Sequence, residues 1–219
     1  MATSFQNRAA NIIAGFEGYI SKATWDENAY RLGFGSDTIT LNDGSYRKVK
    51  KGDVTTKENA TKDLARRIPE FENDVRKIVG GSYDNLTDNA KLAVLSFSYN
   101  YGAGGISTHK QIYDAIKKGD STAVGDAIIN STINDNKGAN FYNYARLRRK
   151  TEGDIAKTNS GNVSNIKRTS KGFDIETEFV NLFTNPTGGK ATPAIIGTIG
   201  LIAVLTLGYY LYKKHKNKK

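Results

Sequence analysis

The stretch GFEGYISKATWDENAYRLGFGSDT, residues 15–38, marks the change from a helical to a β-like pattern on which the fold depends. Before it, apolar side chains recur at helical spacing over residues 4–18, and Gly18 favours the end of that helix. Three short β-like runs follow, at 30–34, 39–41 and 46–49. Glycines and the Asn-Asp-Gly turn at 42–44 separate these runs. We therefore predict an N-terminal helix followed by a small antiparallel sheet.

The residues that follow the sheet carry helical patterns. Thr55 and Glu58 form a capping box that opens a helix, and Pro69 predicts a break or kink within it. Five further helical patterns follow, at about 70–79, 87–101, 107–118, 121–132 and 140–156. The predicted fold class is therefore α+β, mainly α, with an N-terminal helix, a small antiparallel sheet and a helical bundle in one domain over residues 1–156.

Composition and charge exclude several classes of protein. The chain has 219 residues, no cysteine and only two histidines, His109 and His215, which excludes disulfides, thiolate nucleophiles and a histidine-cluster metal site. We therefore expect neither a metal nor a cofactor. The net charge is +10, but residues 1–156 carry 22 Lys and Arg against 19 Asp and Glu, and half of the net charge lies in the basic tail at 213–219. Nucleic acid is therefore expected as a partner only through that tail.

The C-terminal part divides into a linker and an apolar segment. Residues 157–192 are polar and are predicted to form a linker. Within it, the segment 173–183 places apolar side chains on one helical face, which favours either a short helix packed on the domain or an interfacial helix. Residues 193–212, PAIIGTIGLIAVLTLGYYLY, carry no charge and precede several lysines. At about 1.5 Å per residue they span about 30 Å, so we predict a single C-terminal transmembrane helix, the alternative being a buried core helix.

Two carboxylates in the opening stretch point to glycoside cleavage. Glu17 ends the first predicted helix, and Asp26 follows nine residues later on a loop ahead of the sheet. Such a pair can face each other across a cleft, where one carboxyl with a raised pKa protonates the leaving oxygen and the other orients water or stabilises positive charge. The spacing alone also fits two solvated surface acids.

Three motifs resemble those of the phage-type lysozymes, glycoside hydrolase family 24, in the same order along residues 5–156. The motifs are Glu17-Gly18 with Asp26 and Gly33-Phe34-Gly35, then AKLAVLSFSYNYG at 90–102, and RLRRKTEGD at 146–154. The resemblance implies a lysozyme-like domain that cleaves peptidoglycan. It assigns Glu17 as the general acid and Asp26 as the second carboxylate.

Two positions depart from the family pattern. Arg31 stands where the family has a catalytic threonine, and Ser36 stands where it has a histidine after Gly-x-Gly. A guanidinium cannot replace a threonine hydroxyl in holding the attacking water, although it can pair with Asp26 or Glu17. Two reactions therefore stay open. We favour hydrolysis because Asp26 is present; the alternative is lytic transglycosylation, in which the sugar's own 6-hydroxyl attacks and an anhydro product forms.

Further side chains are candidates for the glycan cleft or for the core. By the resemblance, Tyr99 and Asn100 line the cleft, where Asn100 either binds an N-acetyl group or merely ends a helix. Together with Arg31 they are expected to bind substrate. Trp25, the only tryptophan, either stacks on sugar or packs against the sheet. An internal ion-pair network is predicted in the last helix of the domain, from Arg148, Arg149 and Glu152.

The combined features predict a phage enzyme that hydrolyses the β-1,4 bond between N-acetylmuramic acid and N-acetylglucosamine, for penetration or lysis of the host cell wall. Its expected partners are peptidoglycan strands, a lipid membrane through residues 193–212, and other virion proteins. Because the start of the chain lacks a signal-peptide pattern, we expect a single-pass protein of a virion membrane or of the host inner membrane. The rival hypothesis is an inactive lysozyme-like domain that serves as a structural or wall-binding virion protein.

Overall fold

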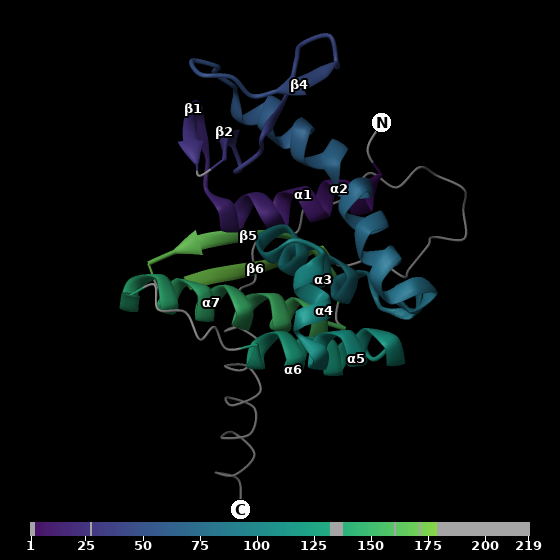
Figure 1. Ribbon diagram of the computed structural model, residues 1–219. Helices are drawn as coiled ribbons and strands as arrows, with labels where there is room; N and C mark the ends of the chain where they lie inside the picture. Colours follow the sequence, from purple (N-terminus) through teal and green to yellow (C-terminus); the bar gives the residue numbers. More distant parts are fainter. Residues whose placement is uncertain (1–2, 27, 132–137, 160, 171, 179–219) are drawn as a thin grey trace, which may run out of the picture. The chain divides into compact units, whose positions relative to one another are not determined.

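The structure, a computed structural model, describes residues 3–26, 28–131, 138–159, 161–170 and 172–178; for residues 138–143 and 178 it describes the backbone alone (Figure 1). Its helices are α1 (Ser4–Glu17), α2 (Lys57–Val79), the 3-10 helix η1 (Gly80–Asn85), α3 (Asp88–Tyr101), α4 (Gly104–Thr108), α5 (Lys110–Lys118), α6 (Ser121–Asn130) and α7 (Gly138–Lys157). Its strands are β1 (Ile20–Asp26), β2 (Ala29–Gly33), β3 (Thr38–Thr40), β4 (Tyr46–Lys48), β5 (Asn162–Thr169) and β6 (Gly172–Glu178). The predicted class, mainly helical α+β, is confirmed.

Helix α1 ends directly before the first hairpin, which places Glu17 at a helix terminus. Thr3 caps the other end: its side chain accepts from the Gln6 backbone at 3.2 Å, and the Gln6 side chain accepts from the Thr3 backbone at 2.8 Å. The inner face of α1 is buried in the main core, through Ala9, Ala10, Ile12, Ile13 and Phe16. Gly18 has a φ of 71°, a conformation that favours glycine, so the helix stops directly after Glu17.

The predicted small sheet is built as separate two-stranded hairpins. β1 pairs antiparallel with β2, and β3 pairs antiparallel with β4. A small core of buried side chains lies under these hairpins: Leu32, Ile39 and Val49. The sequence pattern places Asp26 on a loop, but Asp26 is the last residue of strand β1. Because nearly every β1 residue is exposed, the strand lacks the apolar alternation by which a strand is recognised.

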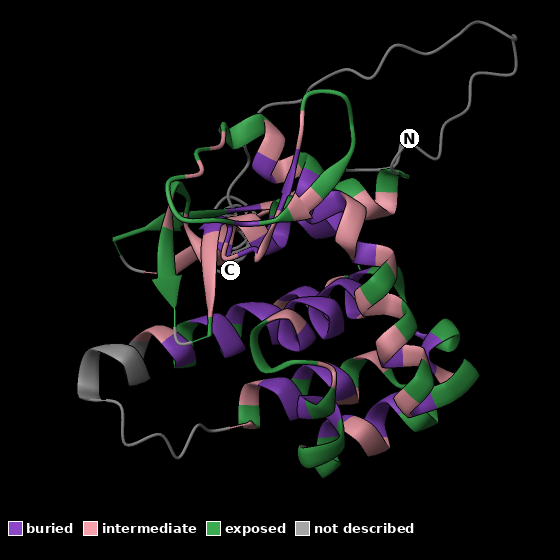
Figure 2. Cartoon of the chain, turned by 45° about the horizontal axis from the view of Figure 1, so that its top comes forward, coloured by how far each residue is buried: buried purple, intermediate pink, exposed green. Residues whose placement is uncertain are grey.

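The helical bundle is arranged around α3. Every α3 residue from 92 to 98 is buried, on all sides of the helix, as its position among α1, α2, α6 and α7 requires. Buried residues, purple in Figure 2, are concentrated in the helices. Helix α2 runs unbroken from Lys57 to Val79 with Pro69 inside it, so of the predicted break or kink the break is wrong. The buried side chains on either side of the proline, Leu64 and Val75 among them, keep the helix packed although one backbone donor is lost.

The predicted linker is wrong over residues 162–178, which form a hairpin that completes the domain. β5 pairs antiparallel with β6. Side chains of both strands lie in or against the main core: Val163, Ile166, Phe173 and Ile175. The helix expected at 173–183 is instead a strand as far as Glu178, since Phe173 and Ile175, two residues apart, share one face of β6.

The remaining C-terminal predictions lie outside the described residues. These are the amphipathic segment beyond Glu178, the transmembrane helix at 193–212 and the basic tail at 213–219. Within the part of the chain that the structure describes, no helix is long and apolar enough to cross a membrane. Residues 1–179 form one compact unit, so the domain extends beyond the boundary predicted at 156.

Candidate active site

The carboxylate of Glu17, at the C-terminal end of α1, is ion-paired through one oxygen and lies near Gly35 with the other. Its Oε1 accepts a hydrogen bond from Nη1 of Arg148 in α7 at 2.7 Å. Its Oε2 faces Gly35, at 4.0 Å from the position that a Cβ there would take. The Glu17 side chain keeps 20% of its surface exposed, so a ligand can reach it. An oriented and partly exposed carboxyl of this kind suits proton transfer to a bound ligand.

Arg148 belongs to a buried cluster in which the charges balance. Its Nε donates to Oε1 of Glu152 at 3.0 Å, and Ser96 donates to the same oxygen at 2.6 Å. Arg149 forms an ion pair with Oε2 of Glu152 at 3.0 Å, without the alignment of a hydrogen bond. Burial lowers the pKa of Arg148, but the carboxylates of Glu152 and Glu17 outweigh it and hold that pKa above its ordinary value. Two arginines thus face two glutamates, and the predicted internal ion-pair network is confirmed.

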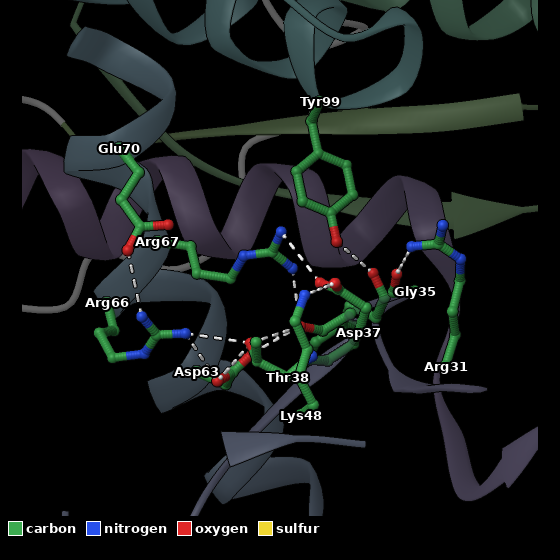
Figure 3. A network of polar contacts seen from close by, with 12 residues as sticks. Arg31, Gly35, Asp37, Thr38, Lys48, Asp63, Arg66, Arg67, Glu70 and Tyr99 are labelled. Carbon is green, nitrogen blue, oxygen red and sulfur yellow. Dashed lines mark hydrogen bonds and ion pairs between the residues drawn. The ribbon is translucent and has the colours of Figure 1, made fainter. Parts of the chain in front are cut away.

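The turn at Gly35 is fixed by a tyrosine and an arginine (Figure 3). Tyr99 of α3 donates its hydroxyl to the Phe34 carbonyl at 2.6 Å. Burial, and after it the charge of Glu17, raises the pKa of Tyr99 above its ordinary value, so the hydroxyl keeps its proton and stays a donor. Arg31 donates to the Gly35 carbonyl at 3.4 Å. The turn thereby presents a residue without a side chain to the Glu17 carboxylate.

Arg31 also pairs with Asp26, which is one of the two partners that the sequence allows. Its Nε lies 2.9 Å from Oδ2 of Asp26, and its Nη2 donates to Asn28 at 3.4 Å. Both side chains of the pair are partly exposed, 34% for Arg31 and 59% for Asp26. The guanidinium therefore links Asp26 to the Gly35 turn, and it engages one oxygen of the carboxylate that the resemblance assigns to water activation.

A buried carboxylate, Asp63 of α2, fixes the residues that follow the turn (Figure 3). It accepts hydrogen bonds from three hydroxyl groups: Ser36 at 2.6 Å, Thr38 at 3.0 Å and Thr40 at 3.0 Å. Arg67 donates to the Ser36 hydroxyl at 2.7 Å as well. Ser36, a departure from the family pattern, thus ties the turn to α2. Sequence reasoning missed Asp63, because only the fold brings α2 against β3.

Two further candidates, Asn100 and Trp25, each contact a neighbouring side chain of the domain. Oδ1 of Asn100 accepts a hydrogen bond from Arg149 at 3.0 Å, so this exposed residue is attached to the buried cluster. The C-terminal cap of α3 is Gly102. Trp25 is 58% exposed and meets Tyr30 edge-on, with 5.1 Å between the ring centroids. Since Tyr30 is the residue opposite on β2, this contact favours packing of Trp25 against its own hairpin.

Comparison with protein families gives one assignment. The sequence matches the model of the phage lysozyme family over residues 14–152. The chain belongs to the phage lysozyme family. The matched residues run from just before Glu17 to Glu152, so they include Glu17, Arg148 and Glu152 of the ion-paired cluster. Comparison with curated protein sequences gives no match.

Solved structures share the lysozyme-like fold with this family member at low sequence identity. The muramidase domain of SpmX from Asticaccaulis excentricus has a TM-score of 0.53 and 21% identity, covering 68% of this chain and 95% of its own. The endolysin of Escherichia coli phage FAHEc1 has a TM-score of 0.52 and 22% identity, and the match covers 68% of this chain and 90% of the endolysin. A lysozyme variant of phage P22 has a TM-score of 0.54 and 19% identity, and the match covers 72% of this chain and 98% of the P22 protein. These likenesses confirm the predicted lysozyme-like fold.

Membership of the phage lysozyme family supports a peptidoglycan-degrading activity. The sequence pointed to Glu17 and Tyr99, and the structure brings these two side chains together at Gly35. The sequence did not indicate that Arg148 is the partner of Glu17. The spacing of Arg148 and Glu152, four residues apart on one helix, indicated their own pairing and nothing about α1. Among the residues that the structure describes, no group of three or more acidic or histidine side chains could hold a metal ion.

Proposed function

We propose that this lysozyme family member hydrolyses the β-1,4 bond between N-acetylmuramic acid and N-acetylglucosamine in peptidoglycan. The observation that carries the proposal is the Glu17 carboxyl, which is partly exposed at a helix end, bound through Oε1 by Arg148 and turned through Oε2 toward Gly35. The family match, and the structural likeness to a muramidase domain and an endolysin, support peptidoglycan as the substrate.

In this proposal Glu17 is the general acid at the glycosidic oxygen. Oε2 gives its proton to the leaving oxygen as the bond to the anomeric carbon breaks, and Arg148 stabilises the carboxylate that remains. Water then bonds to the anomeric carbon and gives up one proton to a carboxylate of the Glu17 and Asp26 pair, with Asp26 orienting the water or stabilising the positive charge on the ring; a reducing end forms and the proton given to the leaving oxygen is replaced. Tyr99, Asn100 and Arg31 are proposed to line the glycan site.

A second candidate, lytic transglycosylation, is favoured by the contact between Arg31 and Asp26. That ion pair engages the carboxylate that hydrolysis needs for water. In transglycosylation the 6-hydroxyl of the muramic acid attacks its own anomeric carbon and passes its proton to Glu17. A 1,6-anhydro end forms and no water is consumed, so Glu17 is the one carboxyl required.

Mass spectrometry of the muropeptides that the full chain releases from peptidoglycan tests both candidates. Hydrolysis gives reducing muramic ends, whereas transglycosylation gives anhydro ends that are lighter by one water. The Glu17→Gln variant is the control and should release neither. Wild-type protein that binds peptidoglycan but releases neither product would overturn the proposal and favour an inactive, wall-binding virion protein.

We propose further that residues 193–212 anchor the chain in a virion membrane or the host inner membrane, and that a phage uses it to open the host wall. The uncharged apolar stretch, its tyrosines and the lysines that follow suit the thickness and the interface of a bilayer. The full chain should stay in the membrane fraction through an alkaline, high-salt wash. Release by salt alone would contradict the anchor, because salt screens charges but does not expel a buried apolar helix.

A further inference from the structure

Hairpin β5–β6 lies beyond the residues that the family model matches, yet it packs against the helix that carries Glu17. The match ends at residue 152, and the hairpin begins at Asn162. Ile166 of β5 lies so close to Gly15 of α1 that a Cβ on Gly15 would come within 2.4 Å of its Cγ1. Because only glycine allows this approach, the strand lies directly against the last turns of α1.

Three aromatic rings join the hairpin to both helices of the candidate site. Phe173 of β6 meets Phe16 of α1 edge-on at 4.7 Å between centroids, and it meets Tyr144 of α7 at 5.8 Å. Tyr144 donates its hydroxyl to the Phe16 carbonyl. That carbonyl lies in the last turn of α1, where the helix offers no partner of its own. Since Phe16 directly precedes Glu17, these contacts hold the backbone next to the general acid.

The same rings extend to the partner of Glu17. The Arg148 guanidinium lies over the Phe16 ring, 4.8 Å from its centroid. Arg168 of β5 lies in the same way over the Tyr144 ring, at 4.9 Å. The Phe16 ring thus contacts both Arg148 and Phe173. Displacing Phe173 would remove support from both members of the Glu17–Arg148 pair.

The start of the hairpin is bound to the first half of α1, away from Glu17. Nε of Arg8 donates to the Val163 carbonyl at 2.8 Å, and Oδ1 of Asn89 accepts from the Val163 amide at 3.0 Å. The Val163 side chain is fully buried in the main core. A substitution that shortens this side chain therefore weakens the hairpin without touching the residues around Glu17.

We propose that the Phe173 end of hairpin β5–β6 positions the active site, and that Phe173 and Tyr144 are positioning residues that set the Glu17 carboxyl against Arg148. Both act through Phe16, whose ring and carbonyl they contact, and neither touches substrate. The kinetic side of this proposal rests on the proposed function, because it measures cleavage of peptidoglycan.

The test compares three variants of the full chain. Phe173→Ala removes one ring, Tyr144→Phe removes only a hydroxyl, and Val163→Ala is the matched control at the other end of the hairpin. We expect kcat to fall about 10- to 100-fold for Phe173→Ala, since small displacements of reacting groups are costly. For Tyr144→Phe we expect a fall of about threefold to tenfold, as for one lost hydrogen bond. KM should stay within about twofold in both, and Val163→Ala should lower the melting temperature with kcat within about twofold.

Hydrogen exchange at the amides of residues 14–17 gives a readout that does not depend on activity. Exchange there should become faster in Phe173→Ala and Tyr144→Phe, and stay at the wild-type rate in Val163→Ala well below its melting temperature. Losses of kcat that merely follow the melting temperature in all three variants would overturn the positioning role. If the wild-type protein does not cleave peptidoglycan, the proposed function fails, and the positioning role is then tested by the exchange rates alone. In that case, amides 14–17 of Phe173→Ala that exchange as slowly as those of the wild type would overturn the positioning role.

Discussion

Nη1 of Arg148 and Oε1 of Glu17 lie 2.7 Å apart, and this contact joins the last helix of the domain to its first. The two residues are 131 positions apart in the sequence. The Arg148 side chain is 3% exposed and the Glu17 side chain is 20% exposed, so the arginine lies in the core and the carboxyl lies at the surface of the site. The geometry of the Glu17 carboxyl, the proposed general acid, therefore depends on the packing of α7, including the Glu152 carboxylate behind Arg148.

Replacing Glu17 should stop wall cleavage without unfolding the domain. Glu17→Gln keeps an acceptor oxygen for Arg148 but has no carboxyl proton to give to the leaving oxygen. We expect the rate of clearing of a cell-wall suspension to fall about 10²- to 10⁴-fold. The melting temperature should fall only modestly, because Arg148 keeps Glu152 as a countercharge and the Glu17 side chain is partly exposed. Glu70→Gln, which alters an exposed carboxylate on α2, is the control and should keep full activity. A Glu17→Gln rate close to wild type would show that the acid lies elsewhere.

Replacing Arg31 should change the products. Arg31→Thr removes the guanidinium from Asp26 and supplies a hydroxyl that can hold water. We expect the yield of reducing ends in the released muropeptides to rise about tenfold, because the Asp26 carboxylate, no longer paired with a guanidinium, can act on the attacking water. Arg31→Lys is the comparison, since it keeps a charge near Asp26 but loses the planar fork. Loss of all cleavage in Arg31→Thr would contradict this prediction and would show that substrate binding by Arg31 outweighs any gain at Asp26.

Removing the central carboxylate of the buried cluster should destabilise the domain strongly. Glu152 is completely buried and faces Arg148 and Arg149. Glu152→Gln leaves one of two buried guanidinium groups without a countercharge, so the free energy of unfolding should fall by about 3–5 kcal/mol. Asp114→Asn, which breaks an exposed pair on α5, should cost less than about 0.5 kcal/mol. Urea unfolding at pH 7 measures both, and similar losses would contradict the structural importance of the cluster.

The pair of Arg47 and Asp53 should make stability depend on pH in acid. Two hydrogen bonds from Arg47, at 2.6 and 2.9 Å, and one from the Lys50 amide lower the pKa of Asp53 from 3.8 to about 2. The unfolded chain therefore binds more protons, so the stabilisation is complete above about pH 4 and is lost as the pH falls toward 2. Asp53→Asn should lower the melting temperature at pH 7 and have a smaller effect near pH 2. An equal decrease at both pH values would show that the pair does not titrate as described.

Local patterns identified much of the fold and part of the site. The apolar face of α1, the Gly18 stop and the position of Glu17 at the helix end follow from residues within one helical segment. The short runs that became β2, β3 and β4 are bounded by glycines and an Asn-Asp-Gly turn, whose backbone preferences act over a few residues. Such features are readable from the sequence because each depends on neighbours in the chain.

Contacts between distant segments could not be read in this way. Nothing in the spacing of α7 indicates that Arg148 reaches Glu17, and nothing in α2 indicates that Asp63 binds the hydroxyl groups behind the Gly35 turn. Hairpin β5–β6 reads as a polar linker, because few of its residues are buried and they become so only against α1 and its glycine at position 15. These partners are selected by packing in three dimensions, where burial and charge balance depend on segments that periodicity along the chain does not bring together.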